Sequence, residues 1–458
     1  MSTPPVICIA NAVDTLRTIA RKAGSDNEYQ DLVGRSFYQQ DQALLWGGAR
    51  KLVITSKPIG ESEWLSRTLG MPDTVNLTPN RETDNIFADI LQDEALVKKI
   101  IGYCGKEKLG QVIPHTTVDA LFAFQREMQQ KYGVRLELPE SPRDLSLRDE
   151  LDRKSGFRKH IGQLERSFPG VRLPEGVICE NLQEAFRAAR GFLTAGKACI
   201  AKADRGEASI GLNIFQSAED LKNLERDLSS NTFLRDEPIV VEEYIHGDDV
   251  FFPSIEYDIN ADKSIPPRMT HICEMLFEGA TNLVGNVTSS DFNKEEWSKN
   301  FHKAGDIIAR DLQSRGYIGH FGMDCVAKRG GDVYLLEMNP RRTGSTHLDD
   351  FGTLFFGPDY GRSMTIGHYD FLMNDRSFKL DDVLESLGDL VQSPAHKDVG
   401  ILPFEISGFS SGRLSFIIFT KSFVSFLDLV ETVRHSPKVS PDRPNQQPPN
   451  LCPKKLES

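Results

Sequence analysis

Short apolar runs alternate with amphipathic stretches along the first 140 residues, and this alternation constrains the fold more than any other feature. The stretches 85–102 and 118–131 have helical periodicity, and runs rich in β-branched residues separate them. Such alternation predicts parallel βαβ units. Strands are expected at 6–10, 51–55, 74–77 and 111–114. No GxGxxG pattern follows the first run, so we expect a structural α/β lobe here rather than a nucleotide site.

The length of 458 residues exceeds what one hydrophobic core supports, so several domains are expected. We predict domains at 1–140, 145–366 and 367–435, followed by a proline-rich disordered tail at 436–458. The net charge of −12 argues against a nucleic-acid or anionic-membrane partner. No apolar run is long enough to span a bilayer, and no secretory signal is expected. Seven scattered cysteines without a CxxC spacing favour reduced thiols and a cytoplasmic location.

The runs 317–326 and 332–338 predict two strands of a hairpin that carries acidic residues. Asp324 lies on the first strand, and Glu337 and Asn339 lie on one face of the second because side chains alternate along a strand. Two carboxylates and an amide oxygen then converge, and these are ligands that Mg²⁺ prefers. The alternative is an exposed hairpin with solvated charges.

Two arginines follow this hairpin. Arg341 lies two residues beyond Asn339 and is expected on the same side, where its planar fork would grip a phosphate or a carboxylate. Arg342 is expected on the opposite face. Both placements assume that strand alternation continues past Asn339.

Two further stretches suit a nucleotide. The apolar strand 239–243 passes into a segment in which Glu242, Tyr244 and Ile245 would face an adenine and Asp249 a ribose. A plain strand with an acidic turn is the alternative. Lys202 ends the apolar run 199–203, and small residues follow it, as in loops that cradle phosphate, although the P-loop spacing is missing. A packing role is the alternative for this lysine.

Taken in order, these stretches resemble the ATP-grasp superfamily over residues 147–350. The resemblance implies an ATP-grasp fold: α/β overall, α+β in the nucleotide-binding part, with a Rossmann-like N-terminal lobe and a small C-terminal αββα unit. It implies ATP and two Mg²⁺ ions, with Lys202 and Arg341 as catalytic residues. The metal positions of the family fall on Asp324, Glu337 and Asn339. Its nucleotide positions fall on Arg153 or Lys154, Lys202, Ser209, Glu242, Glu243, Tyr244, Ile245 and Asp249.

The N-terminal lobe, the run Asn-Pro-Arg-Arg-Thr-Gly at 339–344 and the small C-terminal unit look closest to the pheganomycin-type peptide ligases. That resemblance implies an ADP-forming ligase that joins a carboxylate to an amine through an acyl phosphate, in natural-product or peptide biosynthesis. Small-molecule or peptide substrates, and a homodimer, are the implied partners. A kinase of the same fold and an inactive nucleotide-binding regulatory protein are the rivals.

Neither a Ser–His–Asp nor a Cys–His signature is evident, so no covalent nucleophile is expected. His271, His320 and His347 are candidates for a base that acts on the amine, with packing roles as the alternative. Substrate specificity is expected to lie in loops around 268–290 and 341–360.

Overall fold

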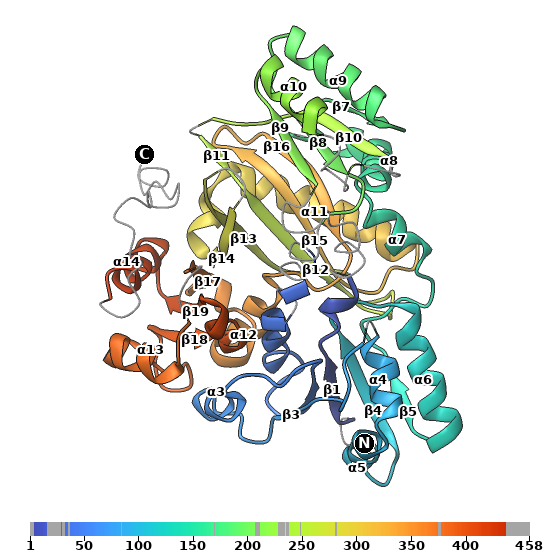
Figure 1. Cartoon of the computed structure of the whole chain (residues 1–458), viewed down its shortest axis with the longest axis vertical. Helices are drawn as coiled ribbons and strands as arrows, with labels where there is room; N and C mark the ends of the chain where they lie inside the picture. The colour runs from blue at the N-terminus through green and yellow to red at the C-terminus, as the bar shows by residue number, and fades with distance from the viewer. Residues whose placement is uncertain are drawn as a thin grey trace.

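The computed structural model of the chain describes residues 4–15, 29, 33–34, 37–83, 85–168, 170–206, 211–227, 234, 238–247, 249–279, 282–373 and 377–436. Ser209 and residues 437–458 of the predicted tail lie outside these ranges. The elements form three sheets (Figure 1). In the described chain, no helix is both long and apolar enough to cross a membrane.

The N-terminal lobe is a five-stranded parallel sheet in the order β3-β2-β1-β4-β5. The four predicted strands are confirmed, and β5 is an additional short edge strand. The helix expected at 85–102 is two helices, because the side chain of Asp93 caps a new helix by accepting from Leu96 N. The elements are β1 (Val6–Ile9), β2 (Lys51–Ile54), α3 (Ser62–Thr68), β3 (Val75–Leu77), α4 (Ile86–Gln92), α5 (Glu94–Cys104), β4 (Leu109–Pro114), α6 (Asp119–Tyr132) and β5 (Arg135–Glu137).

A small antiparallel sheet in the order β7-β10-β8-β9 lies at the opposite end of the molecule (Figure 1, top). Its helices pack on one face through apolar side chains that include Ala185 and Ala189. The two predicted strands of this region, β8 and β10, have the predicted bounds. The elements are β7 (Gly176–Cys179), α9 (Leu182–Thr194), β8 (Cys199–Ala203), β9 (Leu212–Phe215), α10 (Ala218–Asp227) and β10 (Ile239–Glu243).

The third sheet has ten strands and runs through the centre of the molecule, in the order β18-β19-β17-β14-β13-β12-β15-β16-β6, with β11 paired to β15. The strands are β6 (Val171–Arg172), β11 (Val250–Phe251), β12 (Pro253–Ile259), β13 (Arg268–Glu278), β14 (Asn282–Ser289), β15 (Gly319–Lys328), β16 (Val333–Asn339), β17 (Thr365–Leu372), β18 (Gly400–Phe404) and β19 (Arg413–Thr420). Helix α11 (Glu296–Ser314) packs on this sheet through buried residues such as Trp297 and Phe301.

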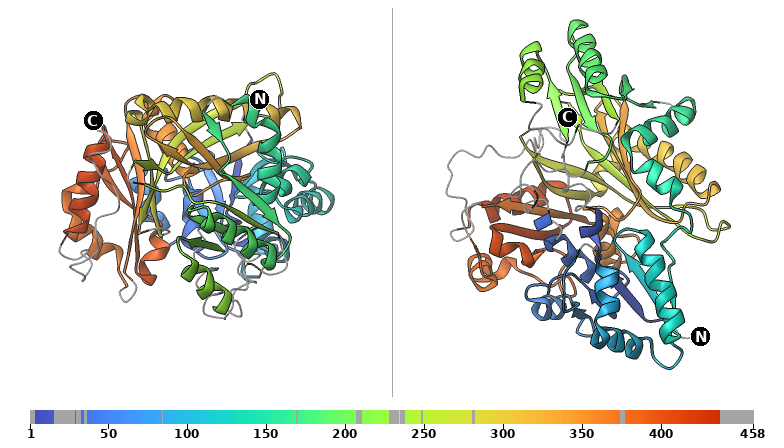
Figure 2. Two further views of the ribbon diagram at one scale, coloured as in Figure 1. Left: turned by 90° about the horizontal axis from the view of Figure 1, so that it is seen from above. Right: turned by 45° about the vertical axis from the view of Figure 1, so that its right-hand side comes forward.

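The C-terminal strands β17, β18 and β19 extend this same sheet and lie beside the N-terminal lobe (Figure 2, right). The boundary proposed at 366/367 falls inside β17, and the domain limits stay a prediction. The two strands of the expected αββα unit are present as β18 and β19, joined by the 3-10 helix Ile406–Ser411. Helices α13 (Leu380–Leu387) and α14 (Phe423–Arg434) complete the unit.

The expectation that residues 268–290 form loops was wrong. Residues Arg268–Glu278 and Asn282–Ser289 form the antiparallel pair β13 and β14, and Thr346–Phe356 forms helix α12. A bulge between Leu276 and Phe277 interrupts the register, and apolar side chains occupy both faces of β13, so its sequence lacks the alternation of a half-buried strand.

Candidate active site

The hairpin of β15 and β16 brings the three predicted metal-binding residues together. Asp324 lies directly opposite Glu337 in the register, and Asn339 lies opposite Gly322. Asn339 Nδ2 donates to Asp324 Oδ2 at 3.1 Å. The amide therefore turns its oxygen away from Asp324 and toward Arg341 Nη1, while the two carboxylates lie opposite each other in the hairpin.

The electrostatics of this group favour a bound cation. Burial and the nearby charge of Glu337 raise the pKa of Asp324 to about 7. Burial acts in the same direction on Glu337, but Lys154 and Lys202 outweigh it and hold the pKa of Glu337 below its usual range. A divalent cation would stabilise both carboxylates in their charged form, and the oxygen-only ligand set fits Mg²⁺.

The resemblance left Arg153 and Lys154 as alternatives for one nucleotide-binding position. The structure places Lys154 in the site and leaves Arg153 exposed. Lys154 Nζ is buried, 2.8 Å from Glu337 Oε2, and donates to the carbonyl of Gly206 at 3.2 Å. Helix α7 (Ser146–Leu151) ends before this point, and helix α8 (Lys154–Leu164) begins with Lys154, whose backbone N–H donates to Asp204 O. The start of helix α8 at this residue therefore directs the Lys154 side chain toward Glu337.

Lys202 and Glu242 face each other across β8 and β10. Lys202 pairs in register with Val240, two residues before Glu242, so the two charged side chains share a face of the small sheet. Lys202 Nζ contacts Glu242 Oε1, and Arg158 Nη1 lies 3.2 Å from Glu242 Oε2. Sequence reasoning missed Arg158, although its position four residues after Lys154 places it on the same face of α8.

A cavity of about 200 Å³ lies between the small sheet and the large sheet. Glu242, Glu243, Tyr244 and Ile245 border it from the segment that ends β10, and Lys202, Asp324 and Glu337 also line it. Its remaining lining is apolar: Ile200, Leu212, Ile214, Phe252, Met275, Phe277, Leu283, Val326 and Leu336. A mostly apolar slot with charged groups is typical of a site for a flat base that carries phosphates.

The predicted ribose contact is not brought together with this cavity. Asp249 is exposed and does not belong to the residues that line it. Tyr244 stacks on His246 with 5.5 Å between the ring centroids, and Glu243 Oε2 lies 3.7 Å from Lys197 Nζ. The apolar residues of β9, β13 and β14 were not predicted as lining residues, since their roles depend on how two separate sheets pack.

A second cavity of about 120 Å³ lies on the other side of Glu337. Asp14 and Thr15, which follow β1, and Val118, which follows β4, line it from the N-terminal lobe. These neighbouring strands mark the point where the strand order reverses, which is where open α/β sheets bind ligands. The rest of the chain contributes Arg148, Leu151, Asp152, Lys154, Arg205, Gly206, Met338, Asn339 and Arg341.

Arg341 and Arg342 point to different surroundings. Arg341 borders the second cavity, and its Nη1 donates to Asn339 Oδ1 at 3.0 Å. Arg342 is 3% exposed and holds Glu140 and Asp350, with closest distances of 3.0 and 2.8 Å. Strand β16 ends at Asn339, so the two arginines diverge because the chain turns at residue 340 and not because strand alternation continues.

Glu256 anchors the loop that carries Arg341. Its carboxylate is fully buried and accepts from the hydroxyls of Thr343, Ser345 and Thr346, the last two at 2.6 and 2.7 Å. A carboxylate that accepts three hydroxyls leaves this loop little freedom. Sequence reasoning missed this residue, because no local pattern connects β12 with residues 343–346.

The three histidines proposed as bases are all buried and have side-chain neighbours. His271 lies 3.9 Å from Glu256, His320 lies 3.6 Å from Glu140, and His347 contacts His368. Among the described residues that line the two cavities at Glu337, none is a histidine. Their proposed role as bases is therefore not supported by the geometry.

Comparison with known proteins identifies the fold. Residues 163–345 match the family described as ATP-grasp domain. The fold is similar to a biotin carboxylase from Campylobacter jejuni in its β,γ-ATP complex, with a TM-score of 0.58 and 12% identity over 95% of this chain and 91% of that one. It is also similar to N5-carboxyaminoimidazole synthetase from Staphylococcus aureus complexed with ADP, with a TM-score of 0.54 and 11% identity over 94% and 96%.

The biotin carboxylase domain of 2-oxoglutarate carboxylase from Hydrogenobacter thermophilus, in complex with MgADP and bicarbonate, gives a TM-score of 0.55 at 12% identity over 95% and 90%. No curated protein matches this sequence. The chain has the ATP-grasp fold, and residues 163–345 of its central region match the ATP-grasp domain family. The closer resemblance to pheganomycin-type peptide ligases stays a prediction.

Proposed function

We propose that the chain is an ATP- and Mg²⁺-dependent ligase that joins a carboxylate to an amine through an acyl phosphate. The observation that carries this proposal is the position of Glu337. It borders both the first cavity, which is mostly apolar, and the second cavity, which is lined by several arginines. A nucleotide in the first cavity and an acceptor in the second would then meet at the predicted metal ligands.

The nucleotide side of this proposal rests on the apolar slot and on two lysines. The base would lie between the sheets beside Tyr244 and Ile245, with Lys202 and Lys154 toward the phosphates. Mg²⁺ held by Asp324, Glu337 and Asn339 would neutralise charge on the phosphate oxygens. The similar structures that contain β,γ-ATP, ADP or MgADP support this choice of nucleotide and metal.

The acceptor side rests on the arginines of the second cavity, which is called the acceptor cavity from here on. Arg148, Arg205 and Arg341 line it, so it favours an anionic group, and a guanidinium fork matches a carboxylate. In the first step the carboxylate oxygen attacks the γ-phosphorus, the bond to the β-phosphate oxygen breaks, and ADP leaves. In the second step an amine attacks the acyl carbon, phosphate leaves, and the amine loses a proton. Positioning and positive charge supply the catalysis.

Phosphate transfer to a hydroxyl is the second candidate. Asp14 and Asp152 also border the acceptor cavity, and a carboxylate can accept the proton of a hydroxyl. The predominance of arginines favours the carboxylate. An inactive binding protein is the third reading, but it would have no need of the converging Asp324, Glu337 and Asn339.

The test is a panel of acids and amines assayed for ADP formation, with mass detection of products and hydroxylamine as a trap for acyl phosphates. We expect ADP to form only with a suitable acid, a hydroxamate with hydroxylamine, and an amide with the amine. Glu337→Gln should abolish all three, whereas Glu296→Gln, a glutamate paired with Lys299 on the surface of α11, serves as the matched control. A stable phosphorylated product without any hydroxamate would refute the ligase and establish the kinase.

A further inference from the structure

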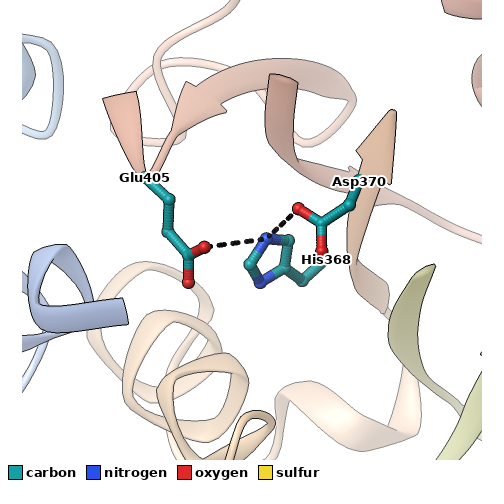
Figure 3. Close-up of side chains that lie close together, drawn as sticks. All are labelled: His368, Asp370 and Glu405. Carbon is teal, nitrogen blue, oxygen red and sulfur yellow. Dashed lines mark ion pairs between the residues drawn. The ribbon is translucent and has the colours of Figure 1, made fainter. Parts of the chain in front are cut away.

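A group of buried ionisable side chains lies away from the active site, where the C-terminal strands meet the N-terminal lobe (Figure 3). His368 and Asp370 share a face of β17, and Glu405 follows β18. His368 Nε2 lies 3.3 Å from Asp370 Oδ1 and 3.9 Å from Glu405 Oε2. One nitrogen and two carboxylate oxygens therefore point toward a common centre, all within 4.8 Å of one another.

Two of these atoms are buried without a hydrogen bond. His368 is 4% exposed and Glu405 is 1% exposed, yet Glu405 Oε2 has no hydrogen-bond partner and His368 Nε2 has only its ion-pair contact with Asp370 Oδ1 at 3.3 Å. Buried polar atoms are rarely left in this state, and an ion at the site is one of the ordinary explanations. Both atoms face the centre of the cluster (Figure 3).

The outer atoms of the same three side chains are held by other residues. His347 Nε2 lies 3.1 Å from His368 Nδ1, Gln42 Nε2 donates to Glu405 Oε1 at 2.7 Å, and Arg413 contacts Asp370 Oδ2. Ligands of a metal ion are characteristically oriented in this way by partners on their far side. These partners leave His368 Nε2 and Glu405 Oε2 aimed at the centre, whereas Asp370 Oδ1 also accepts from the hydroxyl of Ser415.

The charges of the cluster do not balance when the imidazole is neutral. Asp370 and Glu405 contribute two negative charges, and Arg413 contributes one positive charge. Uncompensated buried charge is unfavourable, so the cluster calls for a further cation. Either a proton on His368 or a metal ion can supply it.

The backbone at Glu405 adds a separate observation. Its φ of 48° and ψ of 44° lie in the left-handed region, which non-glycine residues rarely adopt. Such conformations persist where the surroundings hold them, and they gather at sites that bind ligands. Here the conformation accompanies a fully buried carboxylate.

We propose that His368, Asp370 and Glu405 bind a divalent transition-metal ion, with Zn²⁺ as the preferred ion. A ligand set of one imidazole and two carboxylates suits Zn²⁺, whereas Mg²⁺ prefers oxygen alone. Bond lengths of about 2.0–2.2 Å in a tetrahedral site place ligand atoms about 3.3–3.6 Å apart. The histidine and Asp370 already have this spacing at 3.3 Å, Glu405 lies 3.9 Å from the histidine, and all three ligand atoms lie within 4.8 Å of one another, so the carboxylates would move inward on binding.

The bound ion would fasten two parts of the chain that are distant in sequence. Gln42, which orients Glu405, belongs to the 3-10 helix Gln40–Leu44 of the N-terminal lobe, and Ser407 donates to Asp41 of the same helix. The ion would therefore have a structural role at the contact between this lobe and the large sheet. This proposal does not depend on the ligase function.

The experiment measures zinc directly on the full chain. Protein purified without chelators is analysed for metals by mass spectrometry, and chelator-treated protein is titrated with Zn²⁺ by calorimetry and followed by thermal unfolding. We expect one Zn²⁺ per chain and a higher melting temperature with zinc. Glu405→Gln keeps an acceptor for Gln42 but removes a charged ligand, so its zinc affinity should fall at least about 100-fold.

Glu296→Gln is the matched control, since it removes a surface carboxylate that is paired with Lys299 and lies outside both proposed metal sites, and it should leave zinc binding unchanged. Circular dichroism checks that each variant is folded, and His368→Gln provides a second route if Glu405→Gln unfolds. Equal zinc affinity in the wild type and in folded ligand variants would overturn the proposal, as would a wild-type chain that neither contains nor binds zinc. The cluster would then be an ion-pair network with a protonated His368.

Discussion

Arg341 and Arg342 are adjacent in the sequence, and lysine at each position gives a matched pair of perturbations. Arg341 borders the acceptor cavity, and its side chain donates to Asn339. Arg342 forms ion pairs with Glu140 and Asp350, and its guanidinium lies 4.9 Å from the centre of the Trp46 ring. Lysine keeps the positive charge in both cases but loses the planar fork.

The expected cost at Arg342 follows from its burial. Removing one partner of a buried ion pair typically costs about 3–5 kcal/mol. A lysine at this position could serve either Glu140 or Asp350 but not both with the same geometry, so Arg342→Lys should lose about half of that, roughly 2 kcal/mol. The effect should appear in the free energy of unfolding, because Arg342 holds the residues that join the N-terminal lobe to α12.

The expected cost at Arg341 lies in catalysis instead. A positioned donor that acts on charge in the transition state typically contributes about 100-fold or more to kcat. Arg341→Lys should therefore lower kcat by about 100-fold. Its melting temperature and nucleotide affinity should stay close to those of the wild type, because the neighbouring Lys154 and Lys202 remain in place.

Thermal and urea unfolding of both variants, together with ADP formation at saturating ATP, separate the two effects. We expect Arg342→Lys to melt at a lower temperature and to keep most of its kcat while folded. The reasoning fails if Arg341→Lys is the destabilised variant, or if folded Arg342→Lys loses as much kcat as Arg341→Lys. Either result would mean that the two side chains are placed the wrong way round.

Four further changes test other parts of the structure. Glu337→Gln should abolish ADP formation with the fold intact, and excess Mg²⁺ should not restore it; near-normal turnover at limiting Mg²⁺ would exclude the metal role. Lys202→Ala should weaken binding of a non-hydrolysable ATP analogue in calorimetry, whereas a packing role would change only stability. Glu256→Gln should lower kcat by up to about 100-fold through the loop that carries Arg341 and leave nucleotide affinity unchanged; a parallel loss of affinity would argue for a wider collapse. Burial alone would raise the pKa of Glu140, but Arg342 and His320 hold that pKa below its usual 4.5. The ionised Glu140 therefore stabilises the folded state in full above pH 4.5, and this stabilisation is lost as the pH falls through the lowered pKa. Acid unfolding of Glu140→Gln should lack that part of the pH dependence.

Several features could be predicted because they depend on residues close together in the chain. The bounds of β8 and β10 follow from short apolar runs of a few residues. The approach of Asp324 to Glu337 follows from a hairpin with a short turn. In these cases the alternation of side chains along a strand already decides which groups share a face.

Other features depend on packing between distant segments, which local patterns do not encode. The choice of Lys154 over Arg153 depends on a helix start that is bonded to Asp204, fifty residues away. The acceptor cavity depends on how the N-terminal lobe, through Asp14, meets the loop of Arg341.

The contact between Gln42 and Glu405 joins residues 363 positions apart. The sequence by itself therefore determined the elements and the faces on which their charged residues lie, since these depend on short-range periodicity. Only the tertiary structure decided which of those faces meet, because that depends on the burial of apolar surface between separate sheets.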